Sequence, residues 1–306
     1  MYPYLLMVFV VFCYAGNILV GKAINELPPF TIAFFRVFVA FVVLIPFGMR
    51  SAWKTRFTLW EHRWPFLIMT LTGVTFFNTF IYGALQFTTA TNVAVLETVI
   101  PVLTVLLSVY LLKERLRGIQ LVGILMSFLG ALWVVMDGRI LEMTSIAWNI
   151  GDGIMIGAIL TWVVYSIYVK KYMHLFPPFA SLFVMTGLSF IVLLPIVIVE
   201  WSVVGVPTFV LSDHLISFLY LGIFPSLIAL IFYNRAVDLL SASQASVFLN
   251  LMPIVTMVGA YFWLGESISF MEITGTIIVI SGVMLVTQFN PKQRKLPINA
   301  PESQSL

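Results

Sequence analysis

The sequence predicts an all-α polytopic membrane protein, with ten transmembrane helices arranged as two inverted five-helix repeats and both termini in the cytoplasm. Three observations predict it: the apolar composition, the number of apolar segments, and the repetition of the first half of the chain in the second. Of 306 residues, 61% are hydrophobic and 9% are charged, whereas soluble proteins are about half apolar and about a quarter charged. A bilayer accommodates such a chain because helices satisfy their own backbone hydrogen bonds and present apolar side chains to lipid.

Ten segments are long and apolar enough to cross a bilayer, which takes about 20 such residues. They lie near residues 3–21, 30–49, 66–86, 92–112, 119–136, 151–169, 179–199, 215–234, 244–264 and 270–288. The weakest separation is between the third and the fourth, where a short polar run, residues 88–92, leaves room for a tight turn. The first segment has no Lys or Arg ahead of it, so we expect a spanning helix and not a cleaved signal peptide. Residues 289–306 are polar and are expected to form a disordered cytoplasmic tail.

Basic residues orient the spans, because short loops rich in Lys and Arg stay in the cytoplasm. With the N-terminus inside, thirteen of the 16 basic residues lie on the inner side and two, Lys22 and Arg139, on the outer side. The thirteen are Arg50, Lys54, Arg56, Arg63, Lys113, Arg115, Arg117, Lys170, Lys171, Arg235, Lys292, Arg294 and Lys295. Residues 50–64 are therefore predicted to be cytoplasmic, and residues 137–150 to face outward.

The second half of the chain repeats the first. Residues 90–134 align without a gap on residues 242–286, so that Pro101 matches Pro253. Because each copy has five helices, an odd number, the second copy is expected to cross the membrane in the opposite sense. The charges agree, since the three cations of residues 113–117 are missing from the matching segment of the second copy. Two halves related in this way can rock about a central site.

Each half carries the same motif: a Pro within the fourth helix, a Glu shortly after it, and a fifth helix with two spaced Gly residues. The residues are Pro101, Glu114, Gly123 and Gly130 in the first half, and Pro253, Glu266, Gly275 and Gly282 in the second. With this motif the two copies, residues 4–136 and 151–288, resemble the EamA-type repeat of the drug/metabolite transporter superfamily. The resemblance implies a secondary transporter of the plasma or bacterial inner membrane. It would export or exchange small metabolites or drug-like solutes by alternating access, with proton coupling left open.

Enzymatic function is not expected. The sequence has no H-E-x-x-H and no Walker A motif, and its three histidines, His62, His174 and His214, fall in loops or at helix ends. The lone Cys13 excludes an intrachain disulfide and a thiolate metal site. We therefore expect no cofactor, metal or nucleic acid, and as partners a small-molecule substrate and membrane lipid. The alternative to a transporter is a multi-pass membrane protein with a structural or signalling role.

Arg36 and Glu97 are the ionisable residues that lie well inside a predicted span, and charges there are costly enough to suggest a function. At 1.5 Å per residue both lie about 8 Å below the outer boundary, so they are at the right depth to pair. Their counterparts in the second half are Met185 and Leu249, which means that five helices of this type form without either charge. Three interpretations stay open: an ion pair that ties two helices together, a substrate or proton site, and snorkelling to the lipid interface.

Further polar residues are spread over several predicted helices, which suggests that they line a shared central cavity. They are Asn17 and Asn78 in the outer halves of the spans, and Tyr165, Ser166, Asn234, Ser246 and Asn250 in the inner halves. The alternative for each one is a hydrogen bond between helices, worth about 1 kcal/mol. Pro101 and Pro253 are predicted to kink their helices, either for gating or as static bends.

Two patterns concern contacts with lipid and with other helices. Trp53, Trp60 and Trp64 are expected to anchor the chain at the membrane interface. The stripe Gly123, Ser127, Ala131 permits close helix contact, either within a monomer or in a homodimer.

Overall fold

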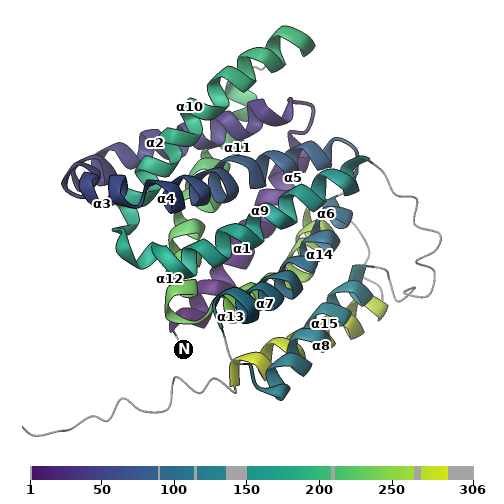
Figure 1. Cartoon of the computed structure of the whole chain (residues 1–306). Helices are drawn as coiled ribbons and strands as arrows, with labels where there is room; N and C mark the ends of the chain where they lie inside the picture. The colour runs from purple at the N-terminus through teal and green to yellow at the C-terminus, as the bar shows by residue number, and fades with distance from the viewer. Residues whose placement is uncertain are drawn as a thin grey trace, which may run out of the picture.

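A computed structural model of the chain describes residues 2–88, 90–113, 116–135, 150–207, 211–264 and 270–288 (Figure 1). Several sequence predictions fall outside these residues. They concern most of the predicted outer loop, residues 137–149, the two motif carboxylates Glu114 and Glu266, and the predicted tail, residues 289–306.

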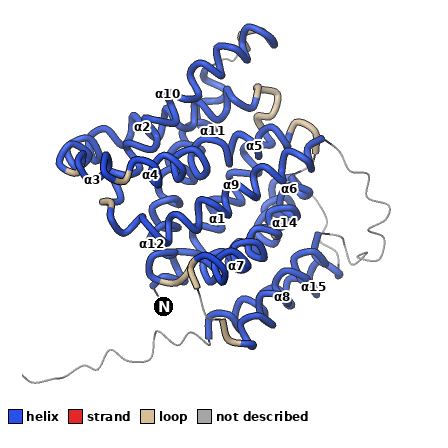
Figure 2. Tube along the Cα trace, in the orientation of Figure 1, coloured by secondary structure: helices blue, strands red, loops and turns tan. Residues whose placement is uncertain are grey.

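The described residues form helices and short helical turns, with no strand among them (Figure 2). The α-helices are α1 (Tyr2–Ala23), α2 (Pro29–Lys54), α3 (Arg56–Glu61), α4 (Arg63–Met69), α5 (Phe77–Leu85), α6 (Ala90–Glu97), α7 (Val99–Leu111), α8 (Gly118–Val135), α9 (Ile150–Tyr172), α10 (Pro178–Val204), α11 (Leu211–Ile223), α12 (Ala229–Leu239), α13 (Ala242–Val247), α14 (Met252–Leu264) and α15 (Phe270–Gln288). Two π-helical segments, η1 (Thr70–Phe76) and η4 (Phe224–Ile228), and two 3₁₀ segments, η3 (Met173–Leu175) and η5 (Phe248–Leu251), join them. The all-helical class is thereby confirmed.

The described part of the chain has seven helical stretches long and apolar enough to cross a membrane, and three shorter apolar helices, Val99–Leu111, Gly118–Gly130 and Ile273–Val286. Several helices run beyond the predicted spans. α2 continues to Lys54, five residues past the predicted end, and α10 continues to Val204. A charged residue marks the edge of the hydrocarbon layer but does not stop a helix. α10 ends where Gly205 takes a left-handed φ of 92°, a conformation that favours glycine at a helix C-terminus.

Four of the predicted spans are interrupted within the chain. The third and the eighth contain the π-helical segments η1 and η4, and the ninth contains the 3₁₀ segment η5. The fourth was predicted as one helix, but α6 ends at Glu97 and α7 begins at Val99. Pro101 accounts for this break, because it has no N–H to donate to the carbonyl of Glu97 four residues earlier. Pro253 lies four residues after Leu249 of η5 in the same way.

The helices pack in pairs that join the two halves of the chain. α2 lies along α10, and α8 lies along α15 on the opposite side of the molecule, with α1, α5, α9 and α12 between them (Figure 1). The α8–α15 contact is close: a Cβ built on Gly282 would lie 2.5 Å from the backbone nitrogen of Ser127 and 2.6 Å from the carbonyl oxygen of Gly123. Gly123 and Ser127 of the small-residue stripe are therefore used within the chain.

Side chains also cap the ends of helices, in one case across the two halves of the chain. The Glu200 carboxylate of α10 accepts hydrogen bonds from the backbone N–H groups of Phe30 and Thr31, at 3.0 and 2.9 Å. These groups open α2, where the helix itself supplies no acceptor and a negative charge is favourable. At the C-terminal ends of other helices, Lys22 donates a hydrogen bond to the last carbonyl of α5, and Lys170 donates to the last carbonyls of α12.

Candidate functional site

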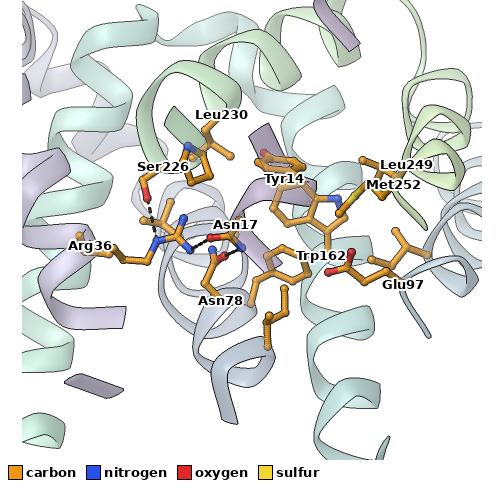
Figure 3. Close-up of a pocket in the computed structure, with 17 residues that line it drawn as sticks. Tyr14, Asn17, Arg36, Asn78, Glu97, Trp162, Ser226, Leu230, Leu249 and Met252 are labelled. Atoms are coloured by element: carbon orange, nitrogen blue, oxygen red, sulfur yellow. Dashed lines mark hydrogen bonds between the residues drawn. The ribbon is translucent and has the colours of Figure 1, made fainter. Parts of the chain in front are cut away.

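A small cavity lies at the centre of the molecule, enclosed by helices of both halves (Figure 3). Its free volume is about 20 Å³, which is room for about one water molecule. Pockets that hold metabolites or drugs typically have about 300–1,000 Å³. The polar and charged residues that line it are Tyr14, Asn17, Arg36, Asn78, Glu97, Trp162 and Ser226. The structure thus brings four of the predicted site residues, Asn17, Arg36, Asn78 and Glu97, to one cavity.

Arg36 of α2 lies at one end of this cavity, 3% exposed, in a network of neutral groups. Its Nε donates to Ser226 Oγ at 2.8 Å, and its Nη1 donates to Asn17 Oδ1 at 2.9 Å and to Tyr82 Oη at 2.5 Å. The Tyr82 hydroxyl donates in turn to Asn17 Oδ1 at 2.8 Å. Asn17 Nδ2 then donates to Asn78 Oδ1 at 3.3 Å. The network positions the guanidinium rigidly on α1, α2, α5 and η4.

The charge of Arg36 is not neutralised by this network. No ion pair reaches the guanidinium from the described part of the chain. A guanidinium has five N–H donors, and no hydrogen bond within the described residues uses those of Nη2. A buried cation without a counter-charge is costly. A carboxylate entering the cavity would supply the missing counter-charge. It would also accept hydrogen bonds from Nη2, since carboxylates form charge-assisted hydrogen bonds with arginine.

Glu97 lies at the other end of the cavity in Figure 3, with Asn17 and Trp162 between it and Arg36. Its side chain is 3% exposed. Among the described residues no hydrogen bond and no ion pair reaches its carboxylate. The ion pair with Arg36 that equal depth allowed is therefore not formed in this structure. Because α6 ends at Glu97, the side chain projects from a helix end beside the interruption.

Aromatic rings line the cavity between the two charged residues. The Trp162 side chain is 1% exposed, and its ring centroid lies 4.3 Å from that of Phe77 and 5.5 Å from that of Tyr14. The Tyr14 hydroxyl is buried and has no hydrogen-bond partner in the described part of the chain. Aromatic faces attract cations, and a free hydroxyl offers a further polar contact. This wall suits the ammonium group of a small ligand next to Glu97.

Other polar residues predicted for a shared cavity do not line this one. Tyr165 Oη donates to Asn234 Oδ1 at 2.6 Å, and Asn250 Nδ2 donates to Ser127 Oγ at 2.9 Å. The Ser246 hydroxyl donates to a backbone carbonyl of its own helix. The single shared cavity is therefore not seen. These residues bond to neighbouring groups where the helices are in contact, and Asn234 lines a separate pocket together with Met173 and Asp238.

The Tyr165–Asn234 bond has a counterpart in the first half. There the tyrosine, Tyr82, is on α5 and the asparagine, Asn17, on α1, whereas in the second half the tyrosine is on α9 and the asparagine on α12. The same polar clamp is thus built twice, with the two residue types exchanged between its helices. Arg36 joins the clamp of the first half alone, because its counterpart in the repeat is Met185.

Sequence reasoning did not identify Tyr14, Tyr82, Trp162 or Ser226 as site residues. Three of them carried a usable signal, since Tyr14 lies three residues before Asn17, Tyr82 lies four residues after Asn78, and Trp162 lies three residues before Tyr165. Such spacings place side chains on one face of a helix. Ser226 has no such signal. Ser226 meets Arg36 across 190 positions of sequence, through the π-helical segment η4.

Comparisons with known proteins agree with the motif found in the sequence. The model of the EamA-like transporter family matches residues 1–136 and 149–288. An uncharacterized transporter of Archaeoglobus fulgidus is 29% identical over 287 residues, which cover 93% of this chain and 96% of the relative. A probable terminal-alkyne amino-acid exporter of Streptantibioticus cattleyicolor is 28% identical over 202 residues, 65% of this chain and 64% of the relative. A solved crystal structure with 16% identity superposes with a TM-score of 0.74, covering 94% of this chain and 98% of that one, and shows the same fold.

Proposed function

This chain belongs to the EamA-like transporter family and is a multi-pass protein of the cell membrane, and we propose that it is a secondary transporter of a small zwitterionic metabolite. One observation carries the proposal: a central cavity is flanked by a buried arginine with neutral partners and by a buried carboxylate with none among the described residues. The relatives in the curated comparison are named transporters.

The substrate class follows from the two ends of the cavity. Arg36 would bind the carboxylate of the substrate through Nη2, and Glu97 would bind its ammonium group against the aromatic wall. An amino acid or a related compound has both groups within a few bonds. The name of the relative from Streptantibioticus cattleyicolor, an amino-acid exporter, supports this class and favours export as the direction of transport.

Alternating access requires two halves that rock about the site. We propose ten transmembrane helices in two inverted repeats, residues 4–136 and 151–288, with both termini cytoplasmic. The helix pairs support this: the second helix of one half packs on the second of the other, as α2 on α10, and the fifth on the fifth, as α8 on α15. The first and third helices pair crosswise, as α1 with α12 and α5 with α9, which is what a two-fold axis between the halves produces.

The two clamps would act as gates in this cycle. The Tyr82–Asn17 clamp with Arg36 closes the outer side of the cavity, and the Tyr165–Asn234 clamp closes the inner side. A cavity with room for about one water corresponds to a state in which both gates are shut. The helix interruptions at Pro101 and Pro253, and at η1 and η4, are the points at which the halves bend, because backbone hydrogen bonds are already missing or displaced there.

Glu97 is also the proposed site of proton coupling, since a carboxylate that alternates between ammonium and proton can link the two fluxes. In proteoliposomes, Glu97→Gln is expected to abolish flux driven by a proton gradient yet to leave solute exchange partly intact. Arg36→Gln is expected to lose both modes. The exposed Arg235, paired with Asp238 at 2.9 Å, supplies the control: Arg235→Gln should transport as the wild type does.

The substrate is identified first, by thermal unfolding of purified protein with amino acids, nucleosides and lipophilic cations. A ligand at a concentration 100 times its dissociation constant stabilises the native state by about 2.7 kcal/mol. We expect zwitterionic compounds to give a stabilisation of this size. The transport role of the two charges would be disproved if the folded double variant of Arg36→Gln and Glu97→Gln carried substrate at the wild-type rate with unchanged pH dependence. If the charges only clamp helices, the double variant should be more stable than either single one.

The proposed orientation has its own test. Replacement of Cys13, the single cysteine, leaves a cysteine-free chain. A cysteine at Thr58 should then react with an impermeant thiol reagent from the cytoplasmic side alone, and a cysteine at Thr144 from outside alone. Labelling of Thr58→Cys in intact cells would reverse the assignment.

A further inference from the structure

A second hollow is lined by residues from the end of α2 and from α3, α4 and α10. Figure 1 shows these helices next to one another. It is a groove of about 1110 Å³, large enough for part of a lipid or drug-sized molecule. Its apolar wall includes Leu67 of α4 and Phe183, Val184 and Leu188 of α10. The central cavity shares none of these residues, so the groove is a separate site.

The rim of the groove is basic and aromatic. Arg50, Arg56 and Arg63 line it together with Trp53, Trp60 and Trp64, and the three tryptophan side chains are 71%, 71% and 66% exposed. Tryptophans of this kind collect at the boundary between hydrocarbon and headgroups. The groove is therefore amphiphilic, with cations at the rim and an apolar wall below.

Two of the arginines are held in place by the tryptophans. Arg56 Nη1 donates to the carbonyl oxygen of Trp53 at 2.7 Å, and its guanidinium lies 4.8 Å from the centroid of that ring. Arg63 Nη1 donates to the carbonyl oxygen of Trp60 at 3.3 Å, with its guanidinium 5.4 Å from that ring. No ion pair reaches either guanidinium within the described residues. Most of their N–H donors remain available to an anion, and stacked arginines present them in a fixed direction.

We propose that this groove binds one anionic phospholipid of the inner leaflet, with its phosphate between the three arginines and an acyl chain along α10 and α4. The choice of a lipid rests on the shape of the site, since a free anion would have no use for the apolar wall. The choice of an anionic lipid rests on charge: residues 50–64 hold four basic residues and one acidic residue, Glu61. Cytoplasmic leaflets carry anionic lipids, and basic pockets between helices bind their headgroups. The inference rests on the proposed orientation and is independent of the proposed substrate.

The test is a binding measurement on full-length protein, delipidated in a neutral detergent. Phosphatidylglycerol is expected to bind more tightly than phosphatidylcholine and to raise the unfolding temperature further. The triple variant Arg50→Gln, Arg56→Gln and Arg63→Gln should lose about fivefold in affinity for phosphatidylglycerol per arginine, on the order of a hundredfold in all. Its affinity for phosphatidylcholine, in which the choline ammonium balances the phosphate charge, should fall much less.

A charge-matched control decides whether the groove or the overall charge is responsible. The variant Lys54→Gln, Arg117→Gln and Lys171→Gln removes three charges from the same predicted side, at positions that do not line the groove. It should bind phosphatidylglycerol as the wild type does. Equal losses in the two triple variants, or equal affinities of the wild type for the two lipids, would overturn the proposal. Stabilisation by inorganic phosphate alone, as large as that by phosphatidylglycerol, would overturn it as well.

Quenching of tryptophan fluorescence by brominated lipid is a second test of lipid binding, and it does not depend on folding of the arginine variant. Brominated phosphatidylglycerol should quench the tryptophan emission of the wild type more strongly than brominated phosphatidylcholine does. The excess should vanish in the variant Trp53→Phe, Trp60→Phe and Trp64→Phe. An excess that persists in this variant would place the bound lipid elsewhere and contradict the proposal.

Discussion

The two tyrosine–asparagine clamps offer a matched pair of substitutions, Tyr82→Phe and Tyr165→Phe. Each removes one buried hydroxyl and leaves the aromatic ring in place, since Tyr82 is 1% and Tyr165 0% exposed. The clamps differ in one respect: Tyr82 also accepts a hydrogen bond from the Arg36 guanidinium. We therefore expect Tyr82→Phe to destabilise the protein more than Tyr165→Phe does.

The size of each loss follows from the bonds removed. Tyr165 loses one neutral bond of 2.6 Å to Asn234, and such bonds between membrane helices are worth about 0.6 kcal/mol on average and about 1.7 at most. Tyr82 loses a neutral bond of 2.8 Å to Asn17 and a charge-assisted one to Arg36, and the charged type contributes about 1.5–3 kcal/mol. The expected costs are about 0.6–1.7 kcal/mol for Tyr165→Phe and about 2–5 kcal/mol for Tyr82→Phe. A gap of about 1.4 kcal/mol corresponds to a tenfold change in the unfolding equilibrium.

The assay is reversible unfolding of both variants and the wild type in bicelles, with the free energy extrapolated linearly against denaturant. Equal slopes for the three proteins would show that the native fold is retained. A loss for Tyr165→Phe equal to or larger than that for Tyr82→Phe would refute the reasoning, because it would mean that Arg36 draws no stabilisation from the tyrosine hydroxyl.

Three further predictions concern packing, pH and helix capping. Gly282→Ala would place a Cβ 2.5 Å from a backbone nitrogen of α8 and is expected to cost about 1–3 kcal/mol; Gly153→Ala, with nothing within 4 Å of its Cβ, should gain up to about 1 kcal/mol. Thermal unfolding should show these opposite signs, and a loss for both would contradict the packing argument. The hydrogen bond of 2.8 Å with His214 holds the pKa of Glu26 below its ordinary value of 4.5. The stability from this bond is therefore present above about pH 4.5 and is lost as the pH falls through the lower folded pKa. Since Glu26 is largely exposed, Glu26→Gln should cost at most about 1 kcal/mol at pH 7, and the difference from wild type in unfolding scans should shrink toward acid pH rather than grow. Glu200→Ala leaves the first N–H groups of α2 without their acceptor and should cost about 0.5–2 kcal/mol; hydrogen exchange should speed up at the start of α2, and unchanged exchange there would rule out the cap.

The sequence was sufficient for the helical class, for most helix positions and for the two charged residues that line the central cavity. Hydropathy and charge are properties of a short stretch of chain, and the cost of burying a charge singles out Arg36 and Glu97 without any knowledge of packing. The ten inverted helices and the cytoplasmic termini stay predictions. The misplaced boundaries have a local cause too: the sequence sets the end of α2 at the charged Arg50, but the helix continues to Lys54.

Which groups the charged residues meet was decided by tertiary structure alone. Arg36 and Glu97 are predicted to lie at the same depth, yet Arg36 bonds to Ser226, Asn17 and Tyr82, and no described residue pairs with Glu97. Depth is set by position along one helix, whereas a hydrogen-bond partner depends on how two helices are rotated and spaced against each other. That geometry comes from contacts far apart in the sequence, such as the backbone approach at Gly282 and the π-helical turn that carries Ser226. Hydropathy determines that a helix spans the membrane, and packing determines what its polar side chains touch.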